Sequence, residues 1–360
     1  MTIDQLTCND FRCLKNVTVY PIAGINILYG ENAQGKTSLL EAICVASGVG
    51  SHRAASDQEL VAFGKEGFSI VLHGRNRTGQ VHVEARYWRR TKRYRLNGVV
   101  LNRLSELLGH VPIVFFCPED IRVVRGSGAE RRRFLDTVLA QVSPSYLQAL
   151  QRYRHALRQR NELLKSEGVT TRLLQPWDDQ LAQYGTLVAE QRAHFLKTLS
   201  ACATRIYQRI VPNAEFRLEY TPDIRLAETA HAVLKQSVTS DIRRKTTQRG
   251  AHRDDFAILL SGKSLRQYGS QGEQRTALLA LRLAQFEFMQ QTLNEFPLLL
   301  LDDVTGELDA ARFEKLLTTI PPQAQCWVTG TDMHFFTKLR SVPIAYFRVR
   351  EGTIEKETSA

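Results

Sequence analysis

Eight consecutive residues, Gly30-Glu31-Asn32-Ala33-Gln34-Gly35-Lys36-Thr37, fit the pattern G-x-x-x-x-G-K-[ST]. The glycines let backbone N–H groups wrap around a phosphate without Cβ clashes, and a helix that follows adds the partial positive charge of its N-terminus. In such loops the lysine, here Lys36, reaches the terminal phosphates of a nucleotide, and the hydroxyl of Thr37 binds Mg²⁺. The pattern therefore predicts that residues 30–37 bind ATP and Mg²⁺, with Lys36 also acting in catalysis.

Two carboxylates end an apolar run near the C-terminus. Residues 298–301 are all leucine, and Asp302 and Asp303 follow directly. This is the form of a Walker B strand, in which Asp302 would hold Mg²⁺ and Asp303 would orient or deprotonate the attacking water. Apolar strands often end in acidic residues, so the prediction depends on its pairing with the loop at 30–37.

A third group of residues stands directly before a long helical pattern. In the run Ser270-Gln271-Gly272-Glu273-Gln274-Arg275, Ser270 can cap the helix and Gly272 permits a close backbone approach. The run resembles the ABC signature motif, where a serine and backbone N–H groups bind the γ-phosphate held by another subunit. Gln271 and Glu273 depart from that motif. The alternative is a plain capping box, Ser-x-x-Glu.

Two further runs resemble ABC elements. Gly306-Glu307-Leu308-Asp309 is similar to the D-loop, which crosses an ABC dimer interface. Thr329-Gly330-Thr331-Asp332 occupies the switch position, where ABC transporters place a histidine. Sensing of the γ-phosphate would here be done by Thr331 or a neighbouring residue.

Strands and helices alternate at both ends of the chain and would position these motifs. β-Branched and aromatic runs predict strands at 17–20, 25–29, 113–116, 258–260, 298–301, 327–329 and 344–349, with several short strands between 69 and 100. Helices are expected at 38–46, 273–293 and 311–319. Lys36 and Asp303 are 267 residues apart in sequence, so nearly everything else is inserted between them. This pattern predicts one α/β domain assembled from both termini.

The middle of the chain is helical in pattern, at 145–165 and 177–210. Apolar residues of the second segment recur at steps of three, four or seven and form one seam: Trp177, Leu181, Tyr184, Val188, Phe195, Leu199 and Ile206. A short linker, residues 165–176, carries the breakers Gly168 and Pro176, so the helices should form an antiparallel hairpin. We therefore expect a P-loop head from residues 1–135 and 250–360, with a helical arm from 136–249.

The net charge of +11 is confined to less than a third of the chain. Residues 51–160 hold 20 cations and 9 anions, and the rest is balanced. Such asymmetry favours a polyanionic partner, nucleic acid first and an anionic membrane second, although a solvated basic face is the alternative. The basic segment at 86–95 interleaves cations with aromatic residues, as nucleic-acid contact requires. The predicted DNA contacts are Arg89, Arg90, Lys92, Arg93 and Arg95, whereas Arg131-Arg132-Arg133 could equally pair with carboxylates inside the protein.

The composition favours a reduced, core-forming protein. Six cysteines are scattered without a Cys-x-x-Cys pair, which favours free thiols and excludes a zinc hook. The start of the chain lacks the basic and apolar regions of a signal peptide, and no apolar stretch approaches a membrane span. A cytoplasmic location without membrane contact is therefore expected.

The motifs together resemble the RecF family of SMC-like, ABC-type ATPases. The resemblance covers almost the whole chain and rests on residues 9–12, 30–37, 116–120, 131–136, 250–255, 270–275 and 301–304. Ala251 departs from it, because the family usually has a proline in the run Gly250–Asp255. The resemblance implies a weak ATPase that dimerises with ATP and binds DNA at junctions between single and double strands. It also implies help in loading RecA, with RecO and RecR as partners.

Other classes of ATPase are the alternatives. The ATP-binding subunit of an ABC transporter would require a switch histidine and a coupling surface. The absent histidine, the 234 residues between Lys36 and Ser270, and the basic segment speak against it. Another SMC-like ATPase stays open, but helices of this length exclude a long coiled coil. A helicase or nuclease motor would need closer Walker elements and further motifs, which this sequence lacks.

Overall fold

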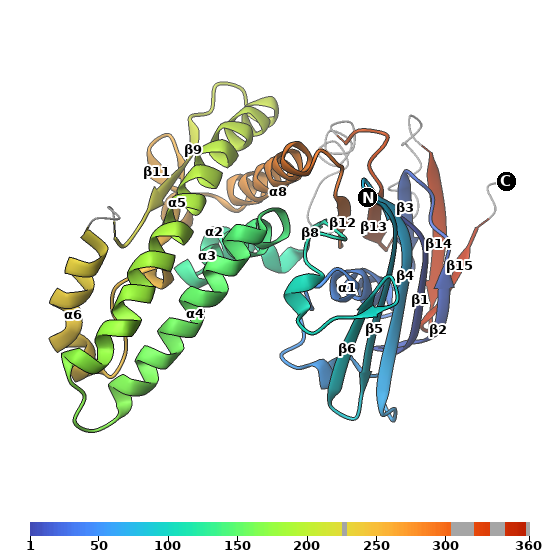
Figure 1. The fold of residues 1–360 in the computed structure, drawn as a ribbon. Coiled ribbons are helices and arrows are strands. Elements are labelled where there is room, and N and C mark those ends of the chain that lie inside the picture. The colour runs from blue at the N-terminus through green and yellow to red at the C-terminus, as the bar shows by residue number, and fades with distance from the viewer. Residues whose placement is uncertain (225–228, 304–319, 332–342, 358–360) are drawn as a thin grey trace. The chain divides into compact units, whose positions relative to one another are not determined.

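A computed structural model describes residues 1–224, 229–303, 320–331 and 343–357 (Figure 1). The chain forms two compact units. Residues Met1–Asp120 and Gln285–Ala360 make one, called the head unit here, and Ile121–Ala284 make the other, called the helical unit. Three predicted features lie outside the described residues: the helix at 311–319, the D-loop-like run at 306–309 and Asp332 of the switch position.

The first sheet of the head unit draws its strands from both ends of the sequence. Its order is β15-β14-β3-β13-β12-β8. All neighbours are parallel except the edge pair β14 and β15. Parallel strands buried on both faces read as continuous apolar runs, and this explains why the inner strands could be predicted closely. The bounds are β3 Ile25–Tyr29, β8 Ile113–Phe116, β12 Leu298–Leu301, β13 Cys326–Gly330, β14 Ile344–Arg350 and β15 Thr353–Lys356.

The second sheet of the head unit is antiparallel, in the order β2-β1-β4-β5-β6-β7. It consists of β1 Thr2–Phe11, β2 Leu14–Val19, β4 Gly67–Asn76, β5 Gly79–Trp88, β6 Thr91–Leu96 and β7 Val99–Val100. The last four strands form the predicted meander between residues 69 and 100. Short 3₁₀ turns at Asp57–Leu60, Leu104–Glu106 and Pro118–Ile121 complete the connections.

Helix α1, Lys36–Ala46, packs against both sheets of the head unit (Figure 1). Ten of its eleven residues are buried, with Thr37 the exception. Apolar residues of α1 and of both sheets share one core cluster. A helix that is buried on all sides has little freedom to move. The loop at its N-terminus is therefore fixed at one end by β3 and at the other end by α1.

The helical unit is built around the predicted antiparallel hairpin. Helices α4, Pro144–Lys165, and α5, Thr171–Ile210, pack along each other, as the sequence predicted. The linker is shorter than expected, because α5 already begins at Thr171 and contains Pro176. A proline there removes one N–H donor to the carbonyl of Arg172, an exposed residue in the first turn where water can replace the bond. The predicted seam packs inward: five of its seven residues are buried, and Trp177 and Tyr184 are half-buried.

Further elements surround the hairpin. They are α2 Arg122–Arg125, α3 Gly128–Val142, α6 Ala230–Arg244, α7 Leu265–Tyr268 and a 3₁₀ turn at Ala251–Arg253. A small antiparallel sheet has the order β11-β10-β9, from Lys263–Ser264, Asp255–Leu260 and Phe216–Thr221. Helix α8, Gln271–Leu293, begins in the helical unit and ends in the head unit.

Buried ion pairs link the helices of this unit. Arg160 is fully buried and donates to Asp178 and Asp241, at 2.6 and 2.8 Å. Arg192 donates to Asp136 at 2.8 Å and to Asp254 at 3.0 Å. Removing one partner of such a pair would leave a buried charge uncompensated, so these pairs fix how the helices pack.

The six cysteines are thiols and not disulfides, as expected from their spacing. Cys8, Cys44, Cys117 and Cys326 are buried, and Cys13 is exposed. Within the described part of the chain, no helix has the length and apolar character needed to cross a membrane.

Candidate nucleotide-binding site

The loop from Gly30 to Gly35 joins the end of β3 to the start of α1. Gly30 has φ 147°, and a Cβ there would lie 2.3 Å from the carbonyl oxygen of Val349. Gly35 has φ 117°, and a Cβ there would lie 3.0 Å from Cys13 Sγ. Both positions therefore require glycine because of backbone conformation and space. Glu31, Asn32 and Ala33 are exposed on the loop between them.

Gln34 anchors the loop to the turn after β14. The N–H of Glu351 donates to Gln34 Oε1 at 2.6 Å, and the N–H of Gly352 donates to the Gln34 carbonyl at 3.0 Å. The side chain of Gln34 is therefore engaged within the protein. Of the eight loop residues predicted to bind nucleotide, Gln34 contributes mainly by holding the loop in shape.

Lys36 reaches back across the loop from the first turn of α1. Its ammonium donates to the carbonyl oxygens of Gly30 at 2.6 Å and Glu31 at 2.7 Å. Burial lowers the pKa of Lys36 from its ordinary value, and the negative charges of Asp303 and Asp302 offset only part of this effect. The lysine is thus a partly desolvated cation at the mouth of the loop.

Thr37 and Asp302 meet at the carboxyl ends of the parallel strands. Thr37 Oγ1 donates to Asp302 Oδ1 at 2.8 Å, and Thr329 Oγ1 donates to the same oxygen at 2.7 Å. Burial raises the pKa of Asp302, while these two hydroxyl donors act to lower it. Hydroxyl and carboxylate oxygens are the ligand types that Mg²⁺ prefers, so the two residues predicted to bind the metal fit it chemically.

Thr329 is a site residue whose part the sequence did not reveal. It is buried at the end of β13, the strand beside β12, and its hydroxyl also accepts from the N–H of Asp303 at 2.8 Å. Asp303 has a left-handed backbone with φ 47° and is exposed. One hydroxyl therefore orients both carboxylate-bearing residues. Thr331, the predicted sensor, is exposed two residues further on.

Arg12 forms a second charged pair near the nucleotide loop. It donates to both oxygens of Glu41, at 2.9 and 2.8 Å, and Glu41 is fully buried in α1. Burial raises the pKa of Glu41, but the hydrogen bonds from Arg12 and Ser51 outweigh it and lower the pKa overall. The pair ties the turn between β1 and β2 to the helix that carries Lys36.

Ser270 and Gly272 belong to the helical unit, at the start of α8. Ser270 Oγ accepts from the N–H of Glu273 at 3.3 Å, and Glu273 accepts from the N–H of Ser270 at 2.7 Å. The capping box that was the alternative interpretation of this run is therefore present, whereas binding of a γ-phosphate remains a prediction. A Cβ added at Gly272 would meet no atom of the described residues within 4 Å, so no contact among them requires glycine there.

The basic segment forms one face of β5 and β6, where residues alternate between the two sides of the sheet. Arg93 and Arg95 are exposed, whereas Lys92 lies on the other side and donates to Asp57 at 2.5 Å. Tyr94 is buried, so it is not available to stack on a base, and the exposed aromatic residue is Trp88. A hollow of about 400 Å³ is lined by the partly buried Glu84 and by exposed residues: Arg86, Trp88, Arg89, Thr91, Arg93, Arg95 and Val100.

Arginines outnumber acidic residues among the side chains that line this hollow. Arg86 and Arg93 are directly opposite each other on neighbouring strands, where like charges repel. Glu84 lies 3.4 Å from Arg86 and 3.6 Å from Arg95, and Arg89 pairs with Glu66.

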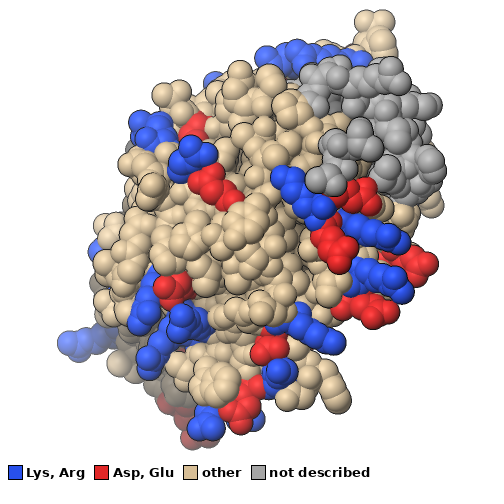
Figure 2. Space-filling model, turned by 90° about the vertical axis from the view of Figure 1, so that its right-hand side faces the viewer, with Lys and Arg blue, Asp and Glu red and all other residues tan. Residues whose placement is uncertain are grey.

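On the face of the molecule shown in Figure 2, Lys and Arg are mixed with Asp and Glu, so positive charge does not form one continuous surface on that face.

The arginine run in α3 is largely structural. Arg131 is buried and donates to both oxygens of Asp255, at 2.6 and 2.8 Å. Arg132 donates to the carbonyl of Asp254 at 2.7 Å. The alternative of pairing with a carboxylate inside the protein is confirmed for Arg131, Arg132 is engaged by a backbone carbonyl, and Arg133 is exposed.

The run Gly250–Asp255 also serves packing inside the helical unit. His252 contacts the Tyr153 hydroxyl at 2.7 Å through Nδ1 and the Thr247 carbonyl at 3.1 Å through Nε2. Burial lowers the pKa of His252 to about 4, so the ring is neutral at physiological pH. Nε2 must then donate and Nδ1 accept, which leaves no free nitrogen for catalysis.

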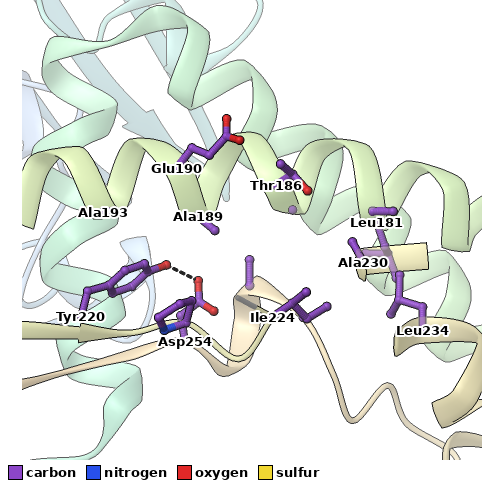
Figure 3. A pocket seen from close by; sticks show the side chains of 15 residues that line it. Leu181, Thr186, Ala189, Glu190, Ala193, Tyr220, Ile224, Ala230, Leu234 and Asp254 are labelled. Atoms are coloured by element: carbon purple, nitrogen blue, oxygen red, sulfur yellow. Dashed lines mark hydrogen bonds between the residues drawn. The ribbon is translucent and has the colours of Figure 1, made fainter. Parts of the chain in front are cut away.

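A cavity of about 420 Å³ lies between α5 and this run (Figure 3). Its walls are mostly apolar or small, and two carboxylates line it, Glu190 on α5 and Asp254 on the opposite side. The Asp254 carboxylate already accepts from Tyr220 at 2.6 Å, from Arg192 at 3.0 Å and from the N–H of Asp223 at 2.9 Å. These bonds already engage both oxygens of Asp254 within the protein.

The fold and the nucleotide loop define an ABC-type, SMC-like ATPase head. The family model "RecF/RecN/SMC N terminal domain" matches residues 2–355. A solved Smc head domain from Pyrococcus furiosus superposes with a TM-score of 0.60 over 99% of this chain and 96% of that one, at 16% identity. That likeness concerns the fold alone.

More similar relatives identify the family. A protein of Lachnoclostridium phytofermentans named DNA replication and repair protein RecF is 36% identical over 99% of this chain and all of its own. Its counterpart in Acetivibrio thermocellus is 36% identical over 98% of this chain and 99% of its own. A solved structure of the recombination mediator protein RecF with ATP, in the RecFOR pathway, has a TM-score of 0.92, 32% identity and coverage of 99% and 97%. The chain belongs to the RecF family.

Proposed function

We propose that the head unit binds MgATP at residues 30–37. The observation that carries this proposal is the meeting of Lys36, Thr37 and Asp302 at the carboxyl ends of β3 and β12. Lys36 would exchange its two carbonyl acceptors for phosphate oxygens, and Thr37 and Asp302 would hold Mg²⁺. The bound ion would neutralise phosphate charge. A solved relative is described as binding ATP, which agrees with this site.

Hydrolysis would be slow and would serve as a switch. Asp303 is exposed beside the loop, and its left-handed backbone is held by Thr329, so its carboxylate could orient or deprotonate a water molecule. ATP binding would set the active state, and hydrolysis would end it.

The switch would act through a homodimer in which each site is completed by Ser270 and Gly272 of the second copy. Gly272 supports this because no described residue of its own chain would meet a side chain there. Glycine is unfavourable inside a helix by about 1 kcal/mol relative to alanine. A glycine that packing does not require is therefore best explained by the close approach of an external group, and a γ-phosphate is such a group.

We propose that DNA binds the hollow on β5 and β6. Arg86 and Arg93 lie directly opposite each other, and Glu84 offsets only part of this charge because it also pairs with Arg95. A phosphate backbone would supply further anions. Arg89, Arg90 and Arg95 would add charge around them. Lys92 is left out of this surface, because it pairs with Asp57 on the other side of the sheet.

Trp88 suggests which form of DNA fits. Its side chain is 55% exposed on the same face as Arg86. An unstacked base binds an aromatic ring, whereas duplex bases are not accessible for stacking. An aromatic residue beside phosphate-binding arginines therefore suits a junction where a single strand leaves a duplex.

In the cell the protein would act in DNA replication and repair, as its relatives are named. The RecF family resemblance further suggests that it assists RecA loading at gaps with RecO and RecR, in the cytoplasm. We also propose that the functional division follows the motifs, with a head of residues 1–135 and 250–360 and an arm of 136–249. The family and the whole-chain relatives set the transporter alternative aside.

Salt-dependent DNA binding tests the interface. Replacing Arg90 and Arg93 by glutamate should weaken binding to a gapped duplex and make the plot of log affinity against log salt less steep by about one unit per lost phosphate contact. Arg217→Glu is the control, because Arg217 is also exposed but lies on β9 of the helical unit. An unchanged slope in the double variant, or an equal change in the control, would refute the assignment.

A further inference from the structure

A mixed cluster of nitrogen, sulfur and oxygen ligands lies in the head unit. His52, Cys117 and Glu119 each offer one ligand atom, and these three atoms lie within 4.8 Å of one another. His52 follows α1 in the chain, and the other two residues follow directly after β8. Its ligand atoms differ from those of Thr37 and Asp302, because these two residues offer only oxygen atoms to a metal ion.

His52 is the member that packing does not explain. Both of its ring nitrogens are buried, and neither has a hydrogen-bond partner among the described residues. The ring lies against Phe115, with centroids 4.4 Å apart. A buried polar group without a partner costs about 1–3 kcal/mol, so a fold rarely retains one unless something else binds it.

The charges around His52 are mainly negative. Glu41, Asp302 and Glu119 lie within electrostatic reach of His52, and Arg53 opposes them with one positive charge. Cys117 is buried at the end of β8, and its thiol is hydrogen-bonded to the Glu119 carboxylate. Glu119 is itself exposed, so an ion could enter from solvent on that side and retain a water molecule as a further ligand.

We propose that His52, Cys117 and Glu119 form a binding site for a borderline-soft divalent transition ion such as Zn²⁺. Imidazole, thiolate and carboxylate together suit Zn²⁺ or Co²⁺, whereas Mg²⁺ prefers oxygen ligands throughout. Binding would release the thiol proton to solvent and leave the thiolate on the metal.

Such an ion would fasten the loop after α1 to the end of β8. Ser51 already fixes one side of that loop, because its hydroxyl donates to Glu41 and accepts from the N–H groups of Arg53 and Ala54. The metal would fix the other side through His52. Since Glu41 and Asp302 face this region, the ion would stiffen the wall of the nucleotide site without using its Mg²⁺ ligands.

Cobalt titration of the full-length protein tests the site. Co²⁺ should produce a thiolate-to-cobalt charge-transfer band in the near ultraviolet, Zn²⁺ should abolish it by displacement, and excess Mg²⁺ should leave it unchanged. Cys117→Ser should lose the band, and Glu119→Gln should weaken cobalt affinity about 10- to 100-fold, the usual effect of damaging a metal site. The control Cys13→Ser removes the exposed thiol and should keep both band and affinity.

Thermal unfolding provides a second readout that does not depend on the band. Zn²⁺ should raise the unfolding temperature of the wild type and of Cys13→Ser, but not that of Cys117→Ser or His52→Asn. The proposal is overturned if the wild type shows no band, if the band survives in Cys117→Ser, or if Cys13→Ser loses it. Displacement of cobalt by Mg²⁺ alone would also overturn it, because it would place the ion on Thr37 and Asp302.

Discussion

Replacing Thr329 by valine tests how the two carboxylates of the nucleotide site are positioned. Valine keeps the shape of threonine but has no hydroxyl. The change removes the 2.7 Å bond to Asp302 Oδ1 and leaves the Asp303 N–H without its 2.8 Å acceptor. Both lost hydrogen bonds are made directly to Asp302 and Asp303, the residues proposed to hold Mg²⁺ and the attacking water.

The expected magnitude follows from these two bonds. A hydrogen bond to a charged group contributes about 1.5–3 kcal/mol, and an unsatisfied N–H costs about 1–3 kcal/mol. Thr37 still donates to the same oxygen of Asp302, and Asp303 is exposed enough for water to help. We therefore expect a loss of about 2.5–3.5 kcal/mol in the free energy of unfolding, the lower part of the summed range.

Function should suffer separately from stability. With Asp302 less well oriented, the Mg²⁺ concentration that half-saturates ATP hydrolysis should rise about 10- to 100-fold, the usual effect of losing a group that orients a metal ligand. Urea unfolding measures the first effect, and ATPase assays across a Mg²⁺ series measure the second. Thr329→Ser is the control, because it keeps the hydroxyl and loses one methyl group, worth about 1 kcal/mol. If valine and serine behave alike in both assays, the positioning role of Thr329 is refuted.

Three further changes test the rest of the site. Lys36→Met should abolish ATP binding, whereas Lys36→Arg should keep some binding with slower turnover; equilibrium binding of labelled ATP would show wild-type affinity in both if the loop were not the site. Gly272→Ala should leave the free energy of unfolding unchanged or raise it by about 0.4–1 kcal/mol, since no described residue would meet the added methyl group. Yet it should weaken ATP-driven dimerisation in sedimentation experiments, and normal assembly would count against a role in trans. Asp302→Asn should raise the free energy of unfolding at neutral pH by about 0.5–2 kcal/mol while ending hydrolysis. The folded state raises the pKa of Asp302, so the charged carboxylate destabilises the fold at neutral pH. The stability gained by Asp302→Asn should therefore vanish as pH falls below the ordinary pKa of aspartate, where both states bind the proton. A stability gain that persists in acid would contradict burial of the charge as its cause.

The sequence predicted the motif-bearing strands closely because their signals are local. Residues 25–29, 113–116 and 298–301 are short apolar runs, and each is a buried strand with those bounds. β1 was not predicted, because a bulge between Ile3 and Gln5 interrupts its alternation. Helix α3 was also missed, although Ser127 and Glu130 form a capping box at its start, a signal that the arginine run obscured.

The site was harder to predict where it depends on neighbouring strands. Lys36, Thr37 and Asp302 belong to motifs, but the role of Thr329 follows from the pairing of β13 with β12, which no local pattern encodes. Lys92 and Arg93 read alike as cations in a basic run. Once β6 is a strand, its alternation puts them on opposite sides, so that Lys92 forms a half-buried ion pair with Asp57 while Arg93 is exposed.

Sedimentation velocity of the purified chain with nucleotide and gapped DNA tests the central claim most directly, namely that ATP at residues 30–37 drives two copies together on DNA. We predict a dimer with MgATP, a monomer with MgADP, and a monomer under both conditions for Lys36→Met. A wild-type monomer at saturating MgATP and DNA, or an identical dimer with ADP and in Lys36→Met, would contradict the account.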